Sequence, residues 1–246
     1  MTLIEQTISN ISIIIPTLNE AQSLSALQPL LKTAAELIVI DGGSTDDTVR
    51  IAQSLGFRVE ACPGGRGAQL NFGAKCASAP TLLFLHADTL LPPDFHHMVT
   101  TCLTRPDTIM GAFRLHVEGG GWLLKNIIRG ANIRSQLLQM PYGDQAFFLL
   151  KENFIKLGGF PELPIMEDYV FVRQAKKRGK VVTLPQEVTT SGRRWQRLGP
   201  VQTTLINQLI ICAYHLGVPA KTLASFYRRG LIFGKFSGNK RAHRRL

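Results

Sequence analysis

The chain has few cysteines, no long hydrophobic run and no acidic residue near its C-terminal end. Its four cysteines form no CxxC pair and no metal-ligand spacing: Cys62, Cys76, Cys102 and Cys212. We therefore expect reduced thiols in a cytoplasmic protein, packed as small apolar side chains. The most apolar late run, Leu205–Leu216, is shorter than the roughly 20 residues that cross a bilayer, so no spanning segment is expected. Because the N-terminus carries Glu5 and no basic stretch, no signal peptide is expected either.

The last acidic residue is Glu187, and the 246-residue chain has a formal net charge of +11. Its final basic residues are Lys235, Lys240, Arg241, Arg244 and Arg245. Nucleic acid, an anionic membrane surface or a phosphorylated substrate would each suit this charge. For residues after about Gly234, a solvated flexible tail is the simpler explanation. The length and the 45% hydrophobic composition fit one large α/β domain, or a domain with an appendage.

The first part of the chain, up to about Pro106, alternates short apolar runs with helical segments. Three runs are typical of strands buried on both faces: Ile11–Ile15, Leu37–Ile40 and Thr81–Leu85. Phe57–Glu60 could be a further strand. Two capping boxes predict the first helix starts: Asn19 with Gln22, and Ser44 with Asp47. This order of strands and helices predicts a parallel, nucleotide-binding half.

Two aspartates, Asp41 and Asp88, stand where predicted strands meet loops. In open α/β sheets, ligands bind at the carboxyl ends of the strands. Asp41, followed by Gly43 and Ser44, could accept a hydrogen bond from a base N–H or a ribose hydroxyl, and an Asx-type turn is the alternative. Asp88 could hold a divalent cation at the sheet edge, and the alternative is that it only stabilises its turn.

A glycine-rich stretch, residues 64–71, follows the third predicted strand. It nearly matches GxGxxG, but Leu70 stands at the third glycine position, so we reject a dinucleotide fingerprint. What remains is a glycine-rich helix start that carries Arg66. Such a start is suited to holding a diphosphate through backbone N–H groups and a guanidinium.

Beyond Pro106 the pattern changes. We expect strands at Gly111–Val117, Ala146–Leu150 and Lys180–Leu184, and helices at Trp122–Met140, 165–178, Pro200–Leu216 and Pro219–Arg228. Glu167 and Asp168 fall in a first helical turn, where carboxylates gain from the helix macrodipole. The alternative to this structural explanation is that Asp168 projects into the cleft and acts as a general base. The segment Ser191–Trp195 is a basic-aromatic cluster able to close over phosphates.

Four motifs occur in order: Pro16-Thr17-Leu18-Asn19-Glu20, Asp41-Gly42-Gly43-Ser44-Thr45-Asp46, His86-Ala87-Asp88 and Glu167-Asp168. With them the chain resembles, over roughly residues 10–200, the family 2 glycosyltransferases, which are inverting enzymes with the GT-A fold. The resemblance implies one α/β domain over residues 1–230, with a mixed, mostly parallel central sheet and helices on both faces. A nucleotide-sugar half (about 10–106), an acceptor half (about 107–200) and C-terminal helices (200–230) would precede a flexible basic tail (231–246).

The resemblance implies a role for each matching position. The nucleotide sugar would be bound by Pro16, Thr17, Asn19, Glu20, Asp41, Gly43, Ser44, Arg66, Gln69, His86, Ala87 and Asp88. Gly143, Asp144 and Gln145 would form the acceptor side, while Arg193, Arg194 and Trp195 would lie near the phosphates. Asp168 matches the catalytic base, with Glu167 beside it.

The implied metal site departs from the family pattern, because His86 replaces the first acid of DxD. Asp88 with phosphate oxygens and waters could still suffice for Mg²⁺, whereas the imidazole of His86 would be better tolerated by Mn²⁺. The resemblance therefore implies a divalent cofactor, Mn²⁺ or Mg²⁺, held by Asp88 and His86.

The predicted reaction moves a sugar from a UDP- or GDP-type donor to an unidentified hydroxyl acceptor, which could be lipid-linked. One alternative is a nucleotidyltransferase that makes nucleotide sugars, although Pro16–Glu20 lacks the glycine and basic residue of its phosphate loop. The other is a non-catalytic basic protein that binds nucleic acid or membrane. No specific nucleic acid is expected, since aromatic and basic residues are not interleaved.

Peripheral contact with the inner face of a membrane is a further hypothesis. It would use Leu205, Ile206, Leu209 and Ile210, and the alternative is that this helix packs on the sheet.

Overall fold

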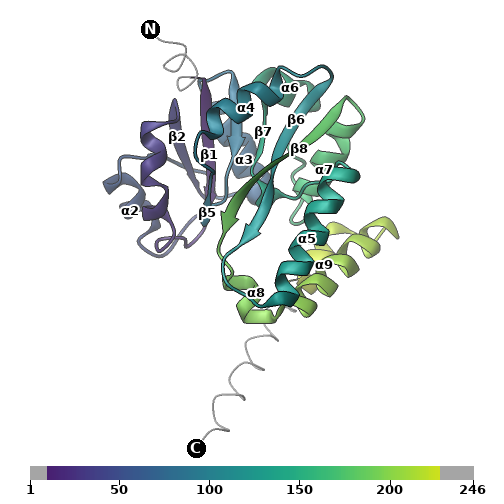
Figure 1. Ribbon diagram of the computed structural model, residues 1–246. Coiled ribbons are helices and arrows are strands. Elements are labelled where there is room, and N and C mark those ends of the chain that lie inside the picture. The colour runs from purple at the N-terminus through teal and green to yellow at the C-terminus, as the bar shows by residue number, and fades with distance from the viewer. Residues whose placement is uncertain (1–9, 228–246) are drawn as a thin grey trace, which may run out of the picture.

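An eight-stranded sheet forms the centre of the computed structural model, which describes residues 10–227 apart from the side chains of Arg194 and Arg197. The strands are β1 (Ile11–Thr17), β2 (Glu36–Asp41), β3 (Arg58–Ala61), β4 (Thr81–Phe84), β5 (Thr89–Leu90), β6 (Thr108–Val117), β7 (Phe147–Leu150) and β8 (Lys180–Thr190). Their order across the sheet is β3-β2-β1-β4-β7-β6-β8-β5 (Figure 1).

The sheet combines parallel and antiparallel pairs. Strands β3, β2, β1 and β4 pair in parallel, as β6 and β8 do. Strand β7 is antiparallel to β4 and β6, and the short β5 is antiparallel to β8. The predicted mixed, mostly parallel sheet is confirmed, and the carboxyl ends of β1, β2 and β4 meet at one edge.

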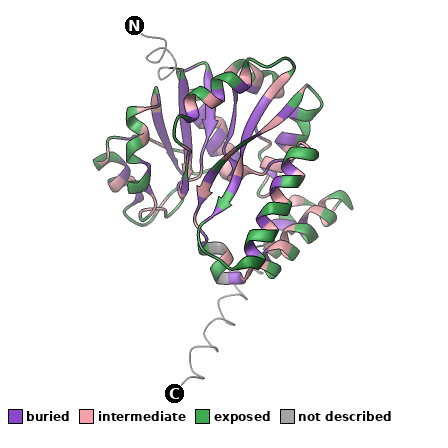
Figure 2. Cartoon of the chain, in the orientation of Figure 1, coloured by how far each residue is buried: buried purple, intermediate pink, exposed green. Residues whose placement is uncertain are grey.

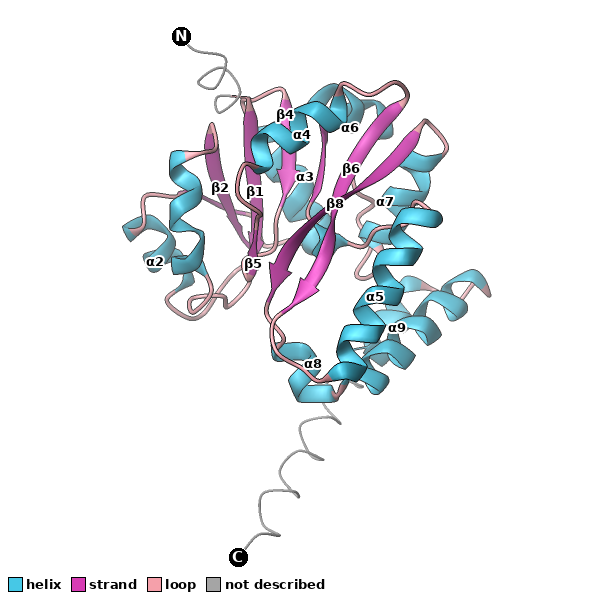
Figure 3. Ribbon diagram, in the orientation of Figure 1, coloured by secondary structure: helices cyan, strands magenta, loops and turns pink. Residues whose placement is uncertain are grey.

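Helices cover both faces of the sheet (Figure 3). One face carries η1 (Leu24–Lys32), α2 (Thr48–Ser54), α4 (Phe95–Leu103) and α5 (Trp122–Leu137), and the other carries α3 (Arg66–Cys76), α6 (Lys151–Leu157) and α7 (Glu167–Lys176). A short turn, η2 (Gly143–Gln145), precedes β7. At the C-terminal side, α8 (Arg193–Leu198) leads into α9 (Pro200–His215), which contacts α5, and residues 220–227 are helical.

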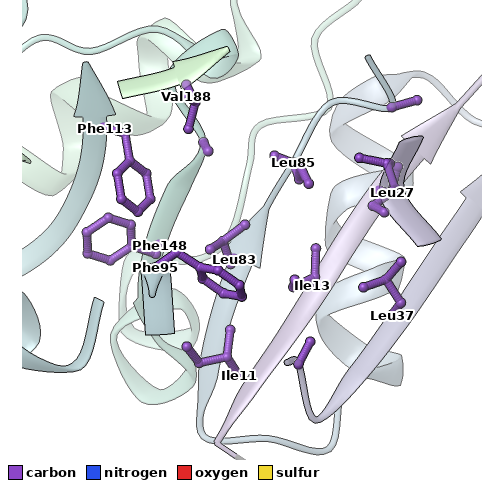
Figure 4. Packing of buried hydrophobic residues seen from close by; sticks show 14 of the residues in the cluster. Ile11, Ile13, Leu27, Leu37, Leu83, Leu85, Phe95, Phe113, Phe148 and Val188 are labelled. Atoms are coloured by element: carbon purple, nitrogen blue, oxygen red, sulfur yellow. The ribbon is translucent and has the colours of Figure 1, made fainter. Parts of the chain in front are cut away.

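Alternation along β1 explains the two cores. Ile13 and Ile15 belong to one hydrophobic cluster and Ile14 belongs to the other, because successive side chains of a strand point to opposite faces. Figure 4 shows Ile13 packed among Leu37 and Leu83 from the neighbouring strands. The purple central strands of Figure 2 are buried on both sides, as their unbroken apolar runs predict.

The observed elements differ from the predicted ones mainly at β5, α6 and the end of β8. Neither β5 nor α6 was expected, and β8 continues well past Leu184 to Thr190. The predicted tail at 231–246 lies outside the described residues, as do residues 228–230 of the expected C-terminal helices. In the described part of the chain, no helix has the length and apolar content needed to span a membrane. All four cysteines are free, as expected, but Cys212 is exposed and is not packed in the core.

Candidate active site

Asp41 ends β2 and organises the turn that follows it. Its Oδ2 accepts hydrogen bonds from the backbone N–H groups of Gly43 and Ser44, both at 2.9 Å, and its Oδ1 accepts one from the Ser44 hydroxyl at 2.5 Å. Burial raises the pKa of Asp41, but these bonds and a weaker one from the Thr17 hydroxyl outweigh that effect, so the pKa lies below its usual value. The Asx-type turn is therefore formed, with Gly43 in the left-handed region at a φ of 99°.

Asn19 joins this turn to the loop after β1. Its Oδ1 accepts a hydrogen bond from the Thr45 N–H (2.9 Å), and its own N–H donates to the Ser44 hydroxyl (2.9 Å). The predicted capping box at Asn19 is wrong, because Asn19 has a φ of 57° and its side chain bonds a distant loop instead. The box at Ser44 is also wrong, because its hydroxyl donates to Asp41 in the same turn and α2 begins without a side-chain cap.

Gln69 connects the carboxyl ends of β1 and β2. This buried side chain lies on α3, and its Nε2 donates to the carbonyls of Thr17 (3.0 Å) and Ile40 (2.8 Å). The backbone at Gly42 lies close to the Gln69 side chain, since a Cβ at position 42 would lie 2.9 Å from Nε2 of Gln69. Gln69 was predicted to contact the nucleotide, whereas its amide nitrogen stabilises the strand ends that carry the Asp41 turn.

Asp88 is paired with Arg193, which follows it by 105 residues. Nη2 of Arg193 lies 3.2 Å from Oδ2 of Asp88 and 2.9 Å from Oε2 of Glu20. Its guanidinium also donates to the Ser23 hydroxyl at 3.0 Å. The carboxylates of Glu20 and Asp88 therefore share one cation, and their hydrogen bonds to Arg193 raise its pKa, with burial opposing them.

The pairing of β5 with β8 brings Arg193 to this position. Thr89 lies opposite Thr190, and the two hydroxyls are 3.0 Å apart. The Ser191 N–H then donates to the Asp88 carbonyl at 3.2 Å. Helix α8 begins two residues later, so its first side chain reaches the Asp88 carboxylate.

Asp168 lies in the first turn of α7, facing the turn η2. Its Oδ2 accepts a hydrogen bond from the Gly143 N–H at 2.8 Å, and its Oδ1 accepts one from the Tyr169 N–H at 2.6 Å. The helix N-terminus favours a negative charge at this position. Met166, just before α7, has a φ of 75°, and left-handed conformations of non-glycine residues concentrate at functional sites.

Glu167, beside Asp168, is buried with 8% of its surface exposed. Its Oε1 lies 3.5 Å from Nε of Arg66, at the start of α3. Burial raises the pKa of Glu167, the negative charge of Asp168 adds to this, and Arg66 opposes it, so the pKa lies above its usual value. The two neighbouring carboxyl groups therefore have different environments, and such a difference allows two carboxyl groups of one site to take different roles.

A cavity of about 390 Å³ opens beside Asp168. Its polar part is lined by Arg66, His86, Tyr142, Gly143, Asp144, Glu167 and Asn207, and its apolar part by Pro164, Ile165, Met166, Ile210, Ile211, Ala224 and Tyr227. A smaller cavity is lined by Pro16, His86 and Asp168 together. Asp168 therefore lies on the same side of the sheet as the His86-Ala87-Asp88 segment.

The remaining predicted residues divide between cavity wall and scaffold. Asp144 lines the cavity. Gln145 is buried, and its Nε2 donates to the Phe113 carbonyl (2.8 Å) and the Ser135 hydroxyl (3.1 Å), so it anchors η2. Ala87 is buried, and Trp195 packs partly buried against the main core. The side chain of Arg194 lies outside the described residues.

Several residues at the site were not predicted from the sequence. Ser23 bonds Arg193, and Thr190 donates to Asp88 at 3.4 Å. Tyr142 lines the cavity beneath the Arg134 guanidinium, which lies 3.4 Å from its ring centre. Tyr142 adjoins the Gly143-Asp144-Gln145 segment, and that position is the one local signal that could have found it.

Similarity to known proteins adds to this geometry. Over 79 residues the chain is 32% identical to an uncharacterized glycosyltransferase of Mycobacterium tuberculosis (strain ATCC 25618 / H37Rv), a match that covers 32% of this chain and 36% of that protein. It is 29% identical over 134 residues to the lipopolysaccharide core biosynthesis glycosyltransferase LpsC of Rhizobium meliloti (strain 1021), covering 50% and 49%. The matches thus span about a third to a half of these curated relatives.

Solved structures show the same fold. Glucosyl-3-phosphoglycerate synthase from Mycobacterium tuberculosis superposes with a TM-score of 0.61 at 20% identity, covering 89% of this chain and 86% of that one. S. aureus TarS 1-349 gives a TM-score of 0.60 at 19% identity, covering 74% and 60%. The fold is the GT-A fold that the resemblance implied. Because the Glycosyl transferase family 2 model matches residues 12–158, the chain belongs to that family.

Proposed function

We propose that this protein transfers a sugar from a nucleotide-diphosphate sugar to an acceptor hydroxyl with inversion at the anomeric carbon. The observation that carries the proposal is the cavity that Asp168, His86 and Arg66 share. It adjoins the sheet edge where the Asp41 turn and Asp88 lie. Two similar structures add support, since the synthase was crystallised with Mn²⁺, uridine-diphosphate-glucose and phosphoglyceric acid, and TarS 1-349 with UDP.

The donor nucleotide would lie over the carboxyl ends of β1 and β2. The turn after Asp41 is fixed by its hydrogen bonds, and the loop that carries Asn19 is hydrogen-bonded to that turn. Asp41 would then act mainly by shaping the pocket, since both its oxygens already accept hydrogen bonds. Arg66 and Arg193 are the cations available to the diphosphate.

The acceptor would occupy the cavity, with its hydroxyl against Asp168. The carboxylate is oriented by the N–H groups of Gly143 and Tyr169. It would remove the hydroxyl proton while the acceptor oxygen forms its bond to the anomeric carbon. The bond from that carbon to the diphosphate oxygen breaks on the opposite face, and the diphosphate leaves with the bonding electrons.

Asp88 would hold a divalent cation once the guanidinium of Arg193, 3.2 Å from its Oδ2, moves away from it. Mg²⁺ is usually held by one or two carboxylates together with substrate phosphates and waters, and Asp88 supplies one carboxylate, with His86 as a second protein ligand. No group of three or more metal-ligating side chains occurs among the described residues, so the diphosphate and water would provide most of the ligands. When bound, such an ion neutralises charge on a leaving diphosphate.

The test is a thermal-shift screen of UDP-, GDP- and dTDP-sugars, each with Mn²⁺, with Mg²⁺ and without metal. We expect one nucleotide class to raise the melting temperature and a divalent metal to increase the shift. Asp168→Asn should retain this shift but lose on the order of 10²–10⁴ in kcat. Glu162→Gln, an exposed carboxylate near the same helix, is the control and should keep normal turnover. Near-normal turnover by Asp168→Asn would remove Asp168 as the base, and the absence of any nucleotide shift would remove the donor site.

A further inference from the structure

Helix α9 carries apolar side chains on two of its sides. On the inner side, Ile210 is buried and Ile206 and Ile211 are partly buried against α7 and residues 220–227. On the outer side, a second series runs at spacings of four, four, three and four: Val201, Leu205, Leu209, Cys212 and Leu216. All five are exposed, and the four larger side chains have between 51% and 84% of their surface accessible. We call this series the α9 stripe.

The α9 stripe is one continuous surface. Each residue of an α-helix turns by about 100°, so these five positions fall within an arc of roughly 80°. Helices that are apolar on all sides are normally buried on all sides. Within the described residues, however, no side chain covers this side of α9. The membrane contact predicted from the sequence uses Leu205, Ile206, Leu209 and Ile210. Leu205 and Leu209 lie on the exposed α9 stripe, whereas Ile206 and Ile210 pack on the inner side of the helix.

Helix α5, which contacts α9 (Figure 3), also has an exposed side. Trp122, Ile133 and Leu137 lie on one stripe of it, and the exposed Lys125 and Arg129 lie among them. Ten of the fourteen exposed large apolar side chains in the described structure belong to residues 122–138 or 201–226. Such a concentration on neighbouring helices marks an interaction surface.

The charge of this region identifies what would cover it. Residues 119–143 and 188–227 contain no aspartate or glutamate, whereas the two segments contribute Lys125, Arg129, Arg134, Arg193, Arg194, Arg197 and Lys221. Leucines, an exposed tryptophan and basic side chains together are the composition of helices that lie in a membrane interface. Each basic residue near an anionic bilayer adds to the attraction.

Two other partners fit less well. A second copy of the chain would have to use the same patch in a two-fold interface, which would set these basic side chains against one another. Nucleic acid would satisfy the charge but gain nothing from the α9 stripe, because its binding rests on phosphate contacts.

We propose that the α9 stripe, supported by the basic exposed side of α5, is a docking surface for an anionic lipid bilayer. The inner side of α9 lines the Asp168 cavity through Asn207, Ile210 and Ile211, so docking would bring that cavity to the lipid surface. The docking surface itself does not depend on sugar transfer, and it can be tested without any substrate.

The experiment is co-sedimentation of the full chain with vesicles of phosphatidylcholine, either alone or mixed with phosphatidylglycerol. Wild type is expected to bind the anionic vesicles and to bind neutral ones much less. The double variant Leu205→Glu/Leu209→Glu should lose roughly tenfold or more in partition, because it removes apolar contact and adds repelled charges. The uncharged variant Leu205→Ser/Leu209→Ser should bind at an intermediate level. Because these side chains are exposed, both variants should unfold at the wild-type temperature.

The matched control is Ile155→Glu, an equally exposed apolar position on α6, which should bind like wild type. Lack of wild-type binding to anionic vesicles, or an equal loss in Ile155→Glu, would overturn the proposal. Light scattering supplies a further check. If wild type is a dimer that Leu205→Glu/Leu209→Glu converts to monomer, then a second copy covers the stripe and the bilayer assignment is wrong.

Discussion

Nη2 of Arg193 lies 3.2 Å from Oδ2 of Asp88, so a guanidinium stands at the carboxylate that would hold the metal in the proposed reaction. The same nitrogen lies 2.9 Å from Oε2 of Glu20. Arginine has no neutral form at physiological pH, and a divalent cation at Asp88 would be repelled by it. Metal and Arg193 should therefore compete for Asp88, unless the guanidinium moves onto the diphosphate.

Arg193→Gln should lower the Mn²⁺ concentration needed for half-maximal stabilisation of the protein at a fixed nucleoside diphosphate concentration. Half of the Arg193 side chain is exposed, and exposed pairs contribute about 0.2–1 kcal/mol. We therefore expect a change of about 1.4- to five-fold, measured by titrating Mn²⁺ in a thermal-shift assay. Arg50→Gln, which breaks another exposed arginine–aspartate pair, with Asp47, is the control and should leave the Mn²⁺ midpoint unchanged. A higher midpoint in Arg193→Gln would mean that Arg193 supports metal binding instead.

Gly143→Ala should impair turnover more than stability. A Cβ at Gly143 would lie 3.1 Å from Oδ2 of Asp168 and 3.3 Å from Nη2 of Arg66, so the carboxylate must shift by a few tenths of an ångström. Small misplacements of a catalytic group cost up to about 10²-fold in rate. Single-turnover kinetics with saturating donor measures this loss. Gly130→Ala is the matched control, because a Cβ within α5 at Gly130 meets no atom within 4 Å. It should keep its activity and gain about 0.5–1 kcal/mol in the free energy of unfolding.

The positions of Asp41 and Asp88 could be predicted because local sequence determines them. Each follows an apolar run that only a buried strand explains, and parallel strands end at a common edge. The same argument found the β1 loop and the helix that begins at Arg66. Asp168 was found by its place in a motif and by its position in a first helical turn.

Contacts between distant segments could not be predicted in this way. The Arg193–Asp88 pair depends on β5, which has two residues and no detectable period. Gln69 and Gln145 look like ligand contacts in the sequence, but both donate to backbone carbonyls that only the folded chain brings near. The capping box at Asn19 failed because its side chain bonds Thr45 in a distant loop, and the one at Ser44 failed because its hydroxyl bonds Asp41, three residues before it.

Gln69→Leu should destabilise the fold and loosen the Asp41 turn. Gln69 Nε2 donates to the carbonyls of Thr17 and Ile40, and leucine would leave both without this donor in a buried position. The Thr17 carbonyl keeps a hydrogen bond from the Gly42 N–H, and the Ile40 carbonyl keeps a weak one from the Thr17 hydroxyl. Each of the two lost hydrogen bonds contributes about 0.5–1.5 kcal/mol, so we expect a loss of about 1–3 kcal/mol in the free energy of unfolding, measured with urea. Gln53→Leu, an exposed position on α2, should change it by less than about 0.5 kcal/mol. An equal effect in both variants would show that the strand ends do not depend on Gln69.

Glu167 should make the protein less stable as pH rises above about 4. Its pKa is raised in the folded protein, first by burial and then by the charge of Asp168, with Arg66 opposing. The unfolded chain therefore releases this proton at a lower pH than the folded chain does. Between the two pKa values the folded state binds more protons, and stability falls with rising pH.

Glu167→Gln removes this titration while keeping a side chain of the same shape near Arg66. The melting temperature of Glu167→Gln relative to wild type should increase as the pH is raised from about 4 toward neutrality, and scanning fluorimetry across that range measures it. The control is Glu152→Gln, which alters an exposed pair with Lys156 on α6 and should show no comparable rise. If instead Glu167→Gln loses stability relative to wild type as the pH rises, the attraction of Arg66 outweighs burial and the repulsion from Asp168. The Glu167–Arg66 pair would then increase the free energy of unfolding at neutral pH instead of lowering it.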